Sequence, residues 1–418
     1  VLAWNPSFEK AGLRNALVVR VQPDEADWDA GDLRYNVLRW ASSPQPPYGG
    51  IGPAVFEPRT GRVLGGDIGL ECSFMRYQLA NVDLYDPSSL VEALTPPSPS
   101  GLQREYCQLG AGLQLDLMFG QALLAAQSAP AHLHEQMVRD SLFMLILHEV
   151  GHTLGLNHNM KATQLLSPDE MNDPSVLESG SLDASIMDYA PVHLATNGAK
   201  QTLFYSIKPG VYDDWAIEFG YAPKLEDADA RAAHLARSTH PELMFGNDAD
   251  DMRSPGAGID PRVNIFDHSS DAIGYAAQRI ELTRDVLGNA LQQSDDDDSL
   301  QRFIYLYAVA GFQINGSART VSRYVGGVHV NRAAPGPEGA TQPYVAVPPS
   351  EQTRAMSVLR SEVFAPGSFP ATDDLVSHLQ PQRRGCDFYG KTEDPKVHDM
   401  VLAIHKGVFE LLLHPVVL

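Results

Sequence analysis

The sequence predicts an α+β fold, with a mixed α/β unit over residues 1–223 and a mainly helical region over residues 224–418. Three observations predict it. The 418 residues exceed what one hydrophobic core usually serves, so two units are expected. The first forty-odd residues alternate helix and strand signals, which indicates mixed packing. From residue 272 onward, apolar residues recur mainly with helical spacing.

The amino-terminal part is expected to form a short helix and three strands of one mixed, twisted sheet. Asn5–Gly12 is typical of a short capped helix. Ala16–Val21 is an apolar run rich in β-branched residues and predicts a buried strand. Tyr35–Trp40 predicts a second strand, and Gly61–Leu70 predicts a third after a turn that ends at Thr60.

Two helices are predicted after these strands. Residues 73–127 form a long insertion, with an exposed Pro- and Ser-rich loop at Thr95–Ser100 and a helix over Gly110–Ala126. The second helix begins near Pro130. Its run Leu142–Leu147 is apolar on every side, so we expect it to be buried in the centre of the domain and to hold its side chains rigidly.

The second helix carries the motif H-E-x-x-H-x-x-G-x-x-H, which runs from His148 to His158. His148 and His152 are four residues apart, so on an α-helix they project from one face and can bind one metal ion. A continuous helix would carry His158 about 9 Å along and roughly 240° around, away from that ion. Gly155 adopts positive φ without steric cost and supplies the bend that returns His158 to the metal.

Three histidines are the donor set of a catalytic zinc site. Neutral imidazoles at His148, His152 and His158 leave the fourth tetrahedral position to water. Water bound to such a Zn²⁺ has its pKa lowered to about 7, and Glu149, next to the first ligand, can accept its proton. The alternative is scattered surface or core histidines. However, 14 histidines in 418 residues rarely fall at this spacing together with the glutamate and the glycine.

The motif resembles the zinc signature of the metzincin metallopeptidases. That resemblance implies a downstream methionine turn, and Met187 within Ser185–Tyr189 fits it. In metzincins this methionine lies beneath the metal and does not bind it. Tyr189 stands where astacin-like and serralysin-like members carry a tyrosine that can approach the zinc, so it either donates to an oxyanion or only lines the cleft wall. Asp188 either orients a ligand histidine or, more simply, caps the turn.

The resemblance also bears on substrate and compartment. In metzincins the strand before the zinc helix borders the cleft and can pair with an extended peptide. Gly65 and Gly66 of the third strand are therefore candidate substrate-binding residues, with an ordinary internal strand as the alternative. Leu2–Gly12, Arg34–Trp40 and the two motifs together resemble a family of mostly exported bacterial zinc-dependent metalloproteases. We therefore expect the protein to be secreted, periplasmic or attached to the cell surface.

Composition limits the partners. The chain has 31 Lys and Arg against 52 Asp and Glu, a formal net charge of −21 that repels nucleic-acid phosphates. No apolar run reaches the roughly 20 residues of a membrane-spanning helix. The start, Val1–Asn5, has neither an initiator methionine nor a signal peptide, so we expect the chain to be a piece of something longer. The partner we expect is a protein or peptide substrate, and the oligomeric state stays open.

Three cysteines allow at most one internal disulfide. Cys72 and Cys107 could pair, although buried free thiols explain them equally well. Cys386 suggests a thiolate that blocks the open zinc position. Its context, Arg383–Asp387, does not match the latency motif of the matrix metallopeptidases, so this interpretation is not favoured.

The second half of the chain shows no second catalytic constellation. Val211–Gly220 is typical of the helix that closes a metzincin domain, and a loop-like acidic segment is expected from Lys224 onward. Phe245–Asp251 could hold Ca²⁺, but its spacing is not that of an EF-hand, so a solvated loop is the preferred interpretation. His329 is interpreted as a strand residue rather than a ligand. Further helices are predicted over Ala272–Gln293, Leu300–Tyr324, Ser350–Phe364 and His398–Leu413, with Asp295–Asp298 as an exposed connection.

The sequence favours a zinc-dependent endopeptidase in which Glu149 activates the attacking water and later protonates the leaving amine. Two alternatives stay open: a non-proteolytic binding or scaffold protein on a metzincin frame, and a zinc amidase that acts on cell-wall peptide. The intact Glu149 and ligand histidines argue against the first. The motif specifies the water but not the pocket, so no side-chain preference is predicted.

Overall fold

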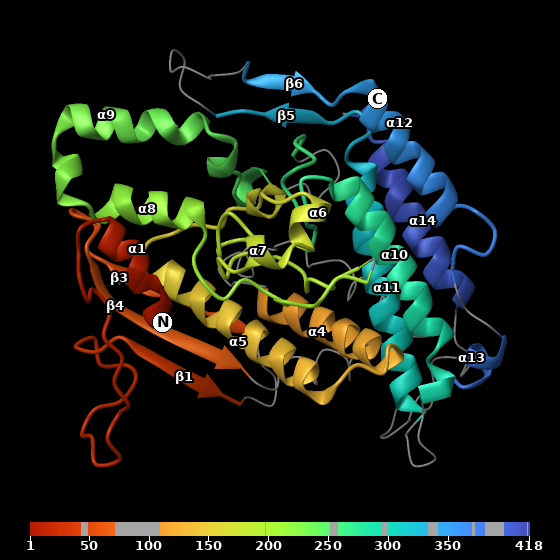
Figure 1. The fold of residues 1–418 in the computed structure, drawn as a ribbon, viewed down its shortest axis with the longest axis horizontal. Helices are drawn as coiled ribbons and strands as arrows, with labels where there is room; N and C mark the ends of the chain where they lie inside the picture. Colours follow the sequence, from red (N-terminus) through yellow and green to blue (C-terminus); the bar gives the residue numbers. More distant parts are fainter. Residues whose placement is uncertain are drawn as a thin grey trace.

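The computed structural model describes the chain except for residues 43–48, 72–108, 197, 251–257, 294–299, 333–341, 370–372, 381–396 and 416. The predictions for Cys72, Cys107, Cys386, Thr95–Ser100 and Asp295–Asp298 lie outside the described residues. The described part forms a small mixed sheet, two long helices beside it, and a group of helices contributed by the second half of the chain (Figure 1). The predicted α+β fold class is confirmed.

The sheet is built around its longest strand. It contains β1 (Val37–Ala41), β2 (Gly50–Ile51), β3 (Ala54–Phe56) and β4 (Val63–Glu71). β1 pairs with β4 in parallel, and β2 and β3 pair with the other edge of β4 in antiparallel. The predicted second and third strands are confirmed as β1 and β4.

The predicted strand Ala16–Val21 is wrong. This segment forms no strand, and Val18, Val19 and Val21 are 70%, 53% and 92% exposed. Its backbone is held by a side chain instead, because the Asn5 amide donates to the Leu17 carbonyl and accepts from the Leu17 N–H. The segment therefore follows the amino-terminal helix and does not reach the sheet.

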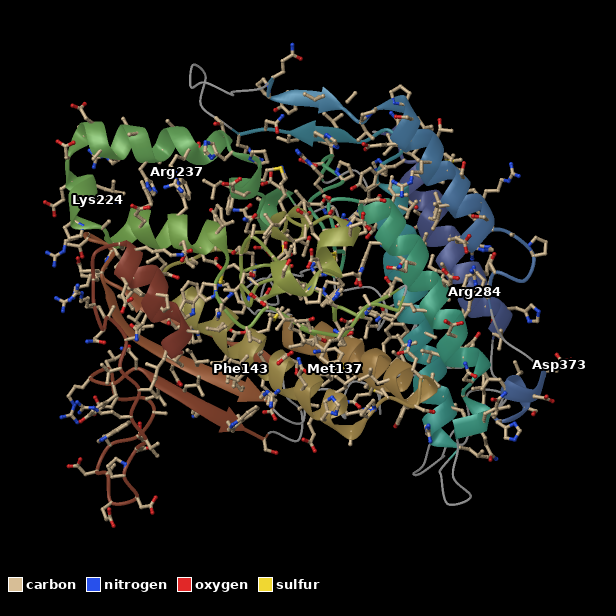
Figure 2. All side chains as sticks on the ribbon, viewed as in Figure 1. Met137, Phe143, Lys224, Arg237, Arg284 and Asp373 are labelled. Carbon is tan, nitrogen blue, oxygen red and sulfur yellow. The ribbon has the colours of Figure 1, made fainter. Side chains whose placement is uncertain are left out.

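Two long helices pack beside the sheet. α4 (Leu109–Ala126) packs on α5 (Ala131–Thr153), which in turn packs against β4 and β2. The predicted burial of the run Leu142–Leu147 holds only in part. Met144 and Leu147 are buried, but Phe143 is 47% exposed on the outer side of α5 (Figure 2). α5 is therefore central on the face that carries the motif and open to solvent on another.

The chain after α5 contains more helix than the sequence predicted. α6 (Pro168–Met171) and α7 (Pro174–Leu177) are single turns, and α8 (Val211–Tyr221) packs against α1 (Asn5–Lys10). The segment after Lys224 was expected to be loop-like, but it contains α9 (Ala228–Ala236). The Asp227 side chain caps this helix by accepting from the Ala230 N–H, so an acidic residue begins the helix here rather than preventing it. Figure 1 shows α8 and α9 side by side at one end of the molecule.

The second half of the chain is mainly helical, as predicted. α10 (Ala272–Gly288) and α11 (Gln301–Ser322) pack closely, and α12 (Pro349–Val358) and α14 (Val397–Leu412) pack against α11. His329 lies in a short strand, as expected. The other elements of this half are β5 (Val328–Val330), β6 (Tyr344–Ala346), a π-helical turn (Leu359–Val363) and α13 (Asp373–Ser377). Short 3₁₀ turns lie at Leu2–Trp4, Ala162–Gln164, Pro223–Glu226, Arg237–Thr239, Pro241–Leu243, Asp248–Asp250 and Leu291–Gln293.

Packing continues across residue 223. The hydrophobic cluster around α4 and α5 includes Leu225, Val263, Val286 and Val309, and a second cluster fills the space between α10, α11, α12 and α14. The division into residues 1–223 and 224–418 stays a prediction. Among the helices of the described ranges, none is long and apolar enough to cross a membrane.

Candidate metal centre

The helix that carries the motif ends where the sequence predicts. α5 stops at Thr153, and Gly155 has φ of +89°. The N–H of Leu156 then bonds back to the carbonyl of Gly151 at 3.0 Å, which closes the helix end. A Cβ at Gly155 would have open space around it, so glycine is needed here for its backbone conformation and not for room.

The bend brings the three histidines together. One ring nitrogen from each of His148, His152 and His158 lies within 4.8 Å of the others, and a single metal ion could be held among them. The ring centroids are 4.7 to 5.3 Å apart. His148 is fully buried, and His158 retains 13% of its side-chain exposure.

Each histidine uses Nδ1 for a contact within the protein. His148 Nδ1 lies 2.8 Å from the Ile186 carbonyl, and His152 Nδ1 lies 3.1 Å from the Leu156 carbonyl. A carbonyl can only accept, so both Nδ1 atoms carry the proton and both Nε2 atoms keep a lone pair. His158 Nδ1 lies 2.7 Å from a carboxylate oxygen of Asp248, which sets the same tautomer. This arrangement leaves Nε2 as the atom of each ring that could bind a metal ion.

The surroundings favour neutral rings, which metal binding requires. Burial, followed by the neighbouring His152 and His158, lowers the pKa of His148 well below its usual range. Burial and then the neighbouring His158 lower the pKa of His152 to about 4. His158 Nε2 is buried and has no hydrogen-bond partner among the described residues. A buried acceptor of this kind fits a zinc ligand.

Glu149 lies beneath the segment that contains β2. Its side chain is fully buried. A Cβ on Gly50 would lie 2.7 Å from Glu149 Oε1, and a Cβ on Gly52 would lie 2.4 Å from the Glu149 backbone oxygen and 3.1 Å from Oε2. Only glycine lets this segment approach α5 so closely. Gly50 and Gly52 were not predicted from the sequence, because only their contact with Glu149, about a hundred residues later in the chain, distinguishes them.

Gly65 and Gly66 lie inside the sheet. They face Val55 and Ala54 of β3 on one edge of β4, and the Gly66 N–H donates to the Asn36 side chain at 2.9 Å. A Cβ on Gly66 would also lie 2.9 Å from Thr153. These glycines allow close packing inside the structure, and their role in substrate binding stays a prediction.

Met187 packs against Gly151 of α5. It is fully buried, and a Cβ on Gly151, which lies between His148 and His152, would come 2.3 Å from the Met187 sulfur. The turn that carries Met187 is anchored by Asp213 of α8. This carboxyl accepts from the Ser185 hydroxyl at 2.5 Å and from the Ile186 N–H at 2.7 Å. Burial raises the pKa of Asp213 to about 7, and these hydrogen bonds oppose the rise.

Tyr189 lies against the histidines. Its ring centroid is 5.6 Å from that of His148 and 4.9 Å from that of His158, and its side chain is 2% exposed. On its other side the Phe266 ring lies at 6.2 Å. Asp188 contacts no ligand histidine in the described contacts. It accepts from the N–H groups of Thr163 and Tyr189, as the simpler interpretation of this residue expected.

The acidic loop was only partly understood from the sequence. Asp248 contacts His158, and Asp250 forms an ion pair with Arg332, so both carboxylates have protein partners. The calcium alternative finds no support here. Asp248 lies 90 residues after His158, and no spacing rule in the sequence connects the two.

Three histidines, the first buried and the other two partly buried, lie on a helix and its terminal bend with a glutamate beside the first of them. This arrangement could hold a metal ion and is typical of the metallopeptidase class. A family model described as Met-zincin matches residues 130–418, and the chain therefore belongs to the Met-zincin family. This supports the metalloprotease class and zinc as the metal, and it confirms the predicted resemblance to metzincins. Comparisons with curated proteins and with solved structures found no match.

Proposed function

We propose that this protein is a zinc-dependent endopeptidase. The observation that carries the proposal is the convergence of three Nε2 atoms beside a buried glutamate. His148, His152 and His158 would hold the zinc, which, when bound, polarises the scissile carbonyl and acidifies the attacking water.

Glu149 performs the proton transfers in this proposal. Its carboxylate takes the proton of the attacking water and later delivers it to the leaving amine, so no covalent intermediate is needed. Full burial of the side chain supports this role, because a carboxylate shielded from bulk water interacts more strongly with a nearby proton donor. The segment Gly50–Gly52 keeps it shielded and oriented.

The residues around the histidines have supporting roles. Ser185–Tyr189 serves as the Met-turn, with Met187 as a hydrophobic floor. This is supported by its close packing on Gly151 between the two helical ligands. In this proposal Tyr189 stabilises developing negative charge, which the short distances from its ring to the rings of His148 and His158 support.

Substrate profiling distinguishes this function from the alternatives. The zinc-loaded protein is incubated with unfolded proteins, peptide libraries and cell-wall peptides, and the products are identified by mass spectrometry. We expect internal cleavage of peptide bonds that a chelator abolishes. Cleavage confined to cell-wall amide bonds would show an amidase. Zinc binding without cleavage of any of these substrates would show a binding or scaffold protein.

The Gly52→Ala variant is expected to lose about 10- to 100-fold in kcat/KM, because the new Cβ meets the backbone of Glu149 and displaces its carboxylate. The measurement is hydrolysis of a fluorogenic peptide. Gly220→Ala is the matched control, since Gly220 lies in α8 with open space around its Cβ position. Full activity of the Gly52→Ala variant would show that this segment does not orient Glu149.

A further inference from the structure

We propose that Asp248 is a positioning residue of the metal centre, which orients His158 through Nδ1, and that Arg332 holds Asp248 in place from the second half of the chain. This inference rests on the metal-binding part of the proposed function. It adds to the motif a carboxylate and a cation that lie 90 and 174 residues beyond His158.

His158 needs such a partner more than the other two ligands do. His148 and His152 stand on α5, and their Nδ1 atoms donate to backbone carbonyls of the same core. His158 follows the bend at Gly155, so no helical hydrogen bonds fix its backbone. Its Nδ1 meets a carboxylate oxygen at 2.7 Å. A charged acceptor binds an imidazole N–H more strongly than a carbonyl does, and it makes Nε2 a better metal ligand.

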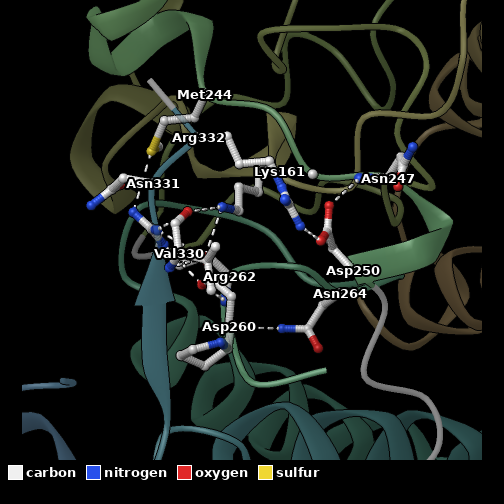
Figure 3. Close-up of polar contacts among 12 residues, drawn as sticks. Lys161, Met244, Asn247, Asp250, Asp260, Arg262, Asn264, Val330, Asn331 and Arg332 are labelled. Carbon is white, nitrogen blue, oxygen red and sulfur yellow. Dashed lines mark hydrogen bonds and ion pairs between the residues drawn. The ribbon is translucent and has the colours of Figure 1, made fainter. Parts of the chain in front are cut away.

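The loop of Asp248 is itself held in a defined shape. Asp248 sits in the turn Asp248–Asp250, where the Ala249 N–H donates to the Asn247 side chain at 3.0 Å. The Asn247 N–H donates to Asp250 at 3.3 Å, and Arg332 forms an ion pair with the same carboxylate (Figure 3). Arg332 thus contacts neither His158 nor Asp248 in the described contacts, but it fixes the turn that presents Asp248.

A buried charge cluster joins the segment that follows His158 to β5, the strand just before Arg332. Lys161, three residues after His158, is 4% exposed and pairs with Asp260 at 2.7 Å. Lys161 Nζ also donates to the Val330 carbonyl of β5 at 2.9 Å, and Arg262 donates to both oxygens of Asp260 at 3.0 and 2.8 Å. Figure 3 shows these contacts gathered at the end of β5, two residues before Arg332. The segment after His158 and β5 are therefore held together by the same buried ion pairs and hydrogen bonds.

Further hydrogen bonds join the residues just after His158 to Gly246, two residues before Asp248. The Met160 N–H donates to the Gly246 carbonyl at 2.7 Å, and the Asn159 side chain bonds to the Gly246 N–H at 3.2 Å. The segment after His158 and the segment before Asp248 are thus joined directly. This leaves Asp248 little freedom to move away from the ring.

The test is the zinc affinity of variants, measured by competition with a chromogenic chelator. We expect Asp248→Ala to weaken zinc binding by about 10- to 100-fold and Asp248→Asn by less, because the amide oxygen still accepts but carries no charge. Arg332→Ala should weaken it in the same direction, and Arg332→Lys should recover most of the loss. Asp229→Asn, an exposed acidic residue of α9, is the matched control and should bind zinc as the wild type does.

A second measurement separates positioning from a general role in folding. The thermal unfolding temperature of the metal-free Asp248→Ala variant should equal that of the metal-free wild type, since Asp248 is 49% exposed. The inference would be overturned if the metal-free Asp248→Ala variant lost thermal stability along with its zinc affinity. It would also be overturned if both Asp248 variants bound zinc as tightly as the wild type does. A wild-type protein that binds no zinc would overturn the proposed function as well, so the two failures are distinguishable.

Discussion

Replacing Glu149 with glutamine is expected to lower peptide hydrolysis by about 10²- to 10⁴-fold and to leave zinc bound. Glutamine has nearly the same size and shape, but its amide cannot take a proton from the attacking water. Zinc should remain, because the three histidine nitrogens form the donor set. The measurement combines kcat/KM on a fluorogenic peptide with the zinc content of the purified variant.

The control for this variant is Glu135→Gln. Glu135 is exposed on the same helix, α5, and lies well before the motif that begins at His148. It should retain wild-type hydrolysis and zinc. Wild-type turnover by Glu149→Gln would show that another group handles the proton, and loss of zinc from it would show that Glu149 supports the metal instead.

Replacing Asp116 with alanine is expected to lower the free energy of unfolding by about 3 to 5 kcal/mol, the usual cost of breaking a buried charge pair. Asp116 of α4 is fully buried and pairs with Arg279 of α10. It also accepts from the Val192 N–H and, at 3.0 Å, from Gln313 of α11. Without the carboxylate, the Arg279 charge would stay buried without its counter-ion.

Denaturant unfolding at neutral pH measures this effect. Lys10→Ala is the control, because the Lys10–Asp214 pair has a lysine side chain that is 62% exposed, and such surface pairs contribute about 0 to 1 kcal/mol. The shape of the transition tests the predicted division at residue 223. We expect Asp116→Ala to destabilise both parts together in one transition. Two separate transitions, with only one affected, would show that the parts unfold independently.

The zinc site was largely predictable because its geometry is local. The spacing of His148 and His152 follows from the helix repeat, and the position of His158 follows from one glycine with positive φ. These relations involve consecutive residues only, so no tertiary information is needed. The helices of the second half were predictable for the same reason, since each shows its own apolar periodicity.

The rest depends on contacts that the sequence does not display. Ala16–Val21 has the composition of a strand but pairs with no strand, whereas β2 has only two residues and lies against α5. Gly65 and Gly66 pair with β3 on one edge of β4, and the sequence does not show which strands become neighbours. Asp248 reaches His158 only through a fold in which segments far apart in sequence meet.

The most direct test of the central claim is the zinc content of the wild-type protein, together with its cleavage of an unfolded protein substrate before and after treatment with a chelator. We expect one zinc ion per chain and internal cleavage that is lost with the metal and restored when zinc is returned. Cleavage that persists in the zinc-free protein, or a zinc-loaded protein that cleaves no peptide bond, would contradict the account.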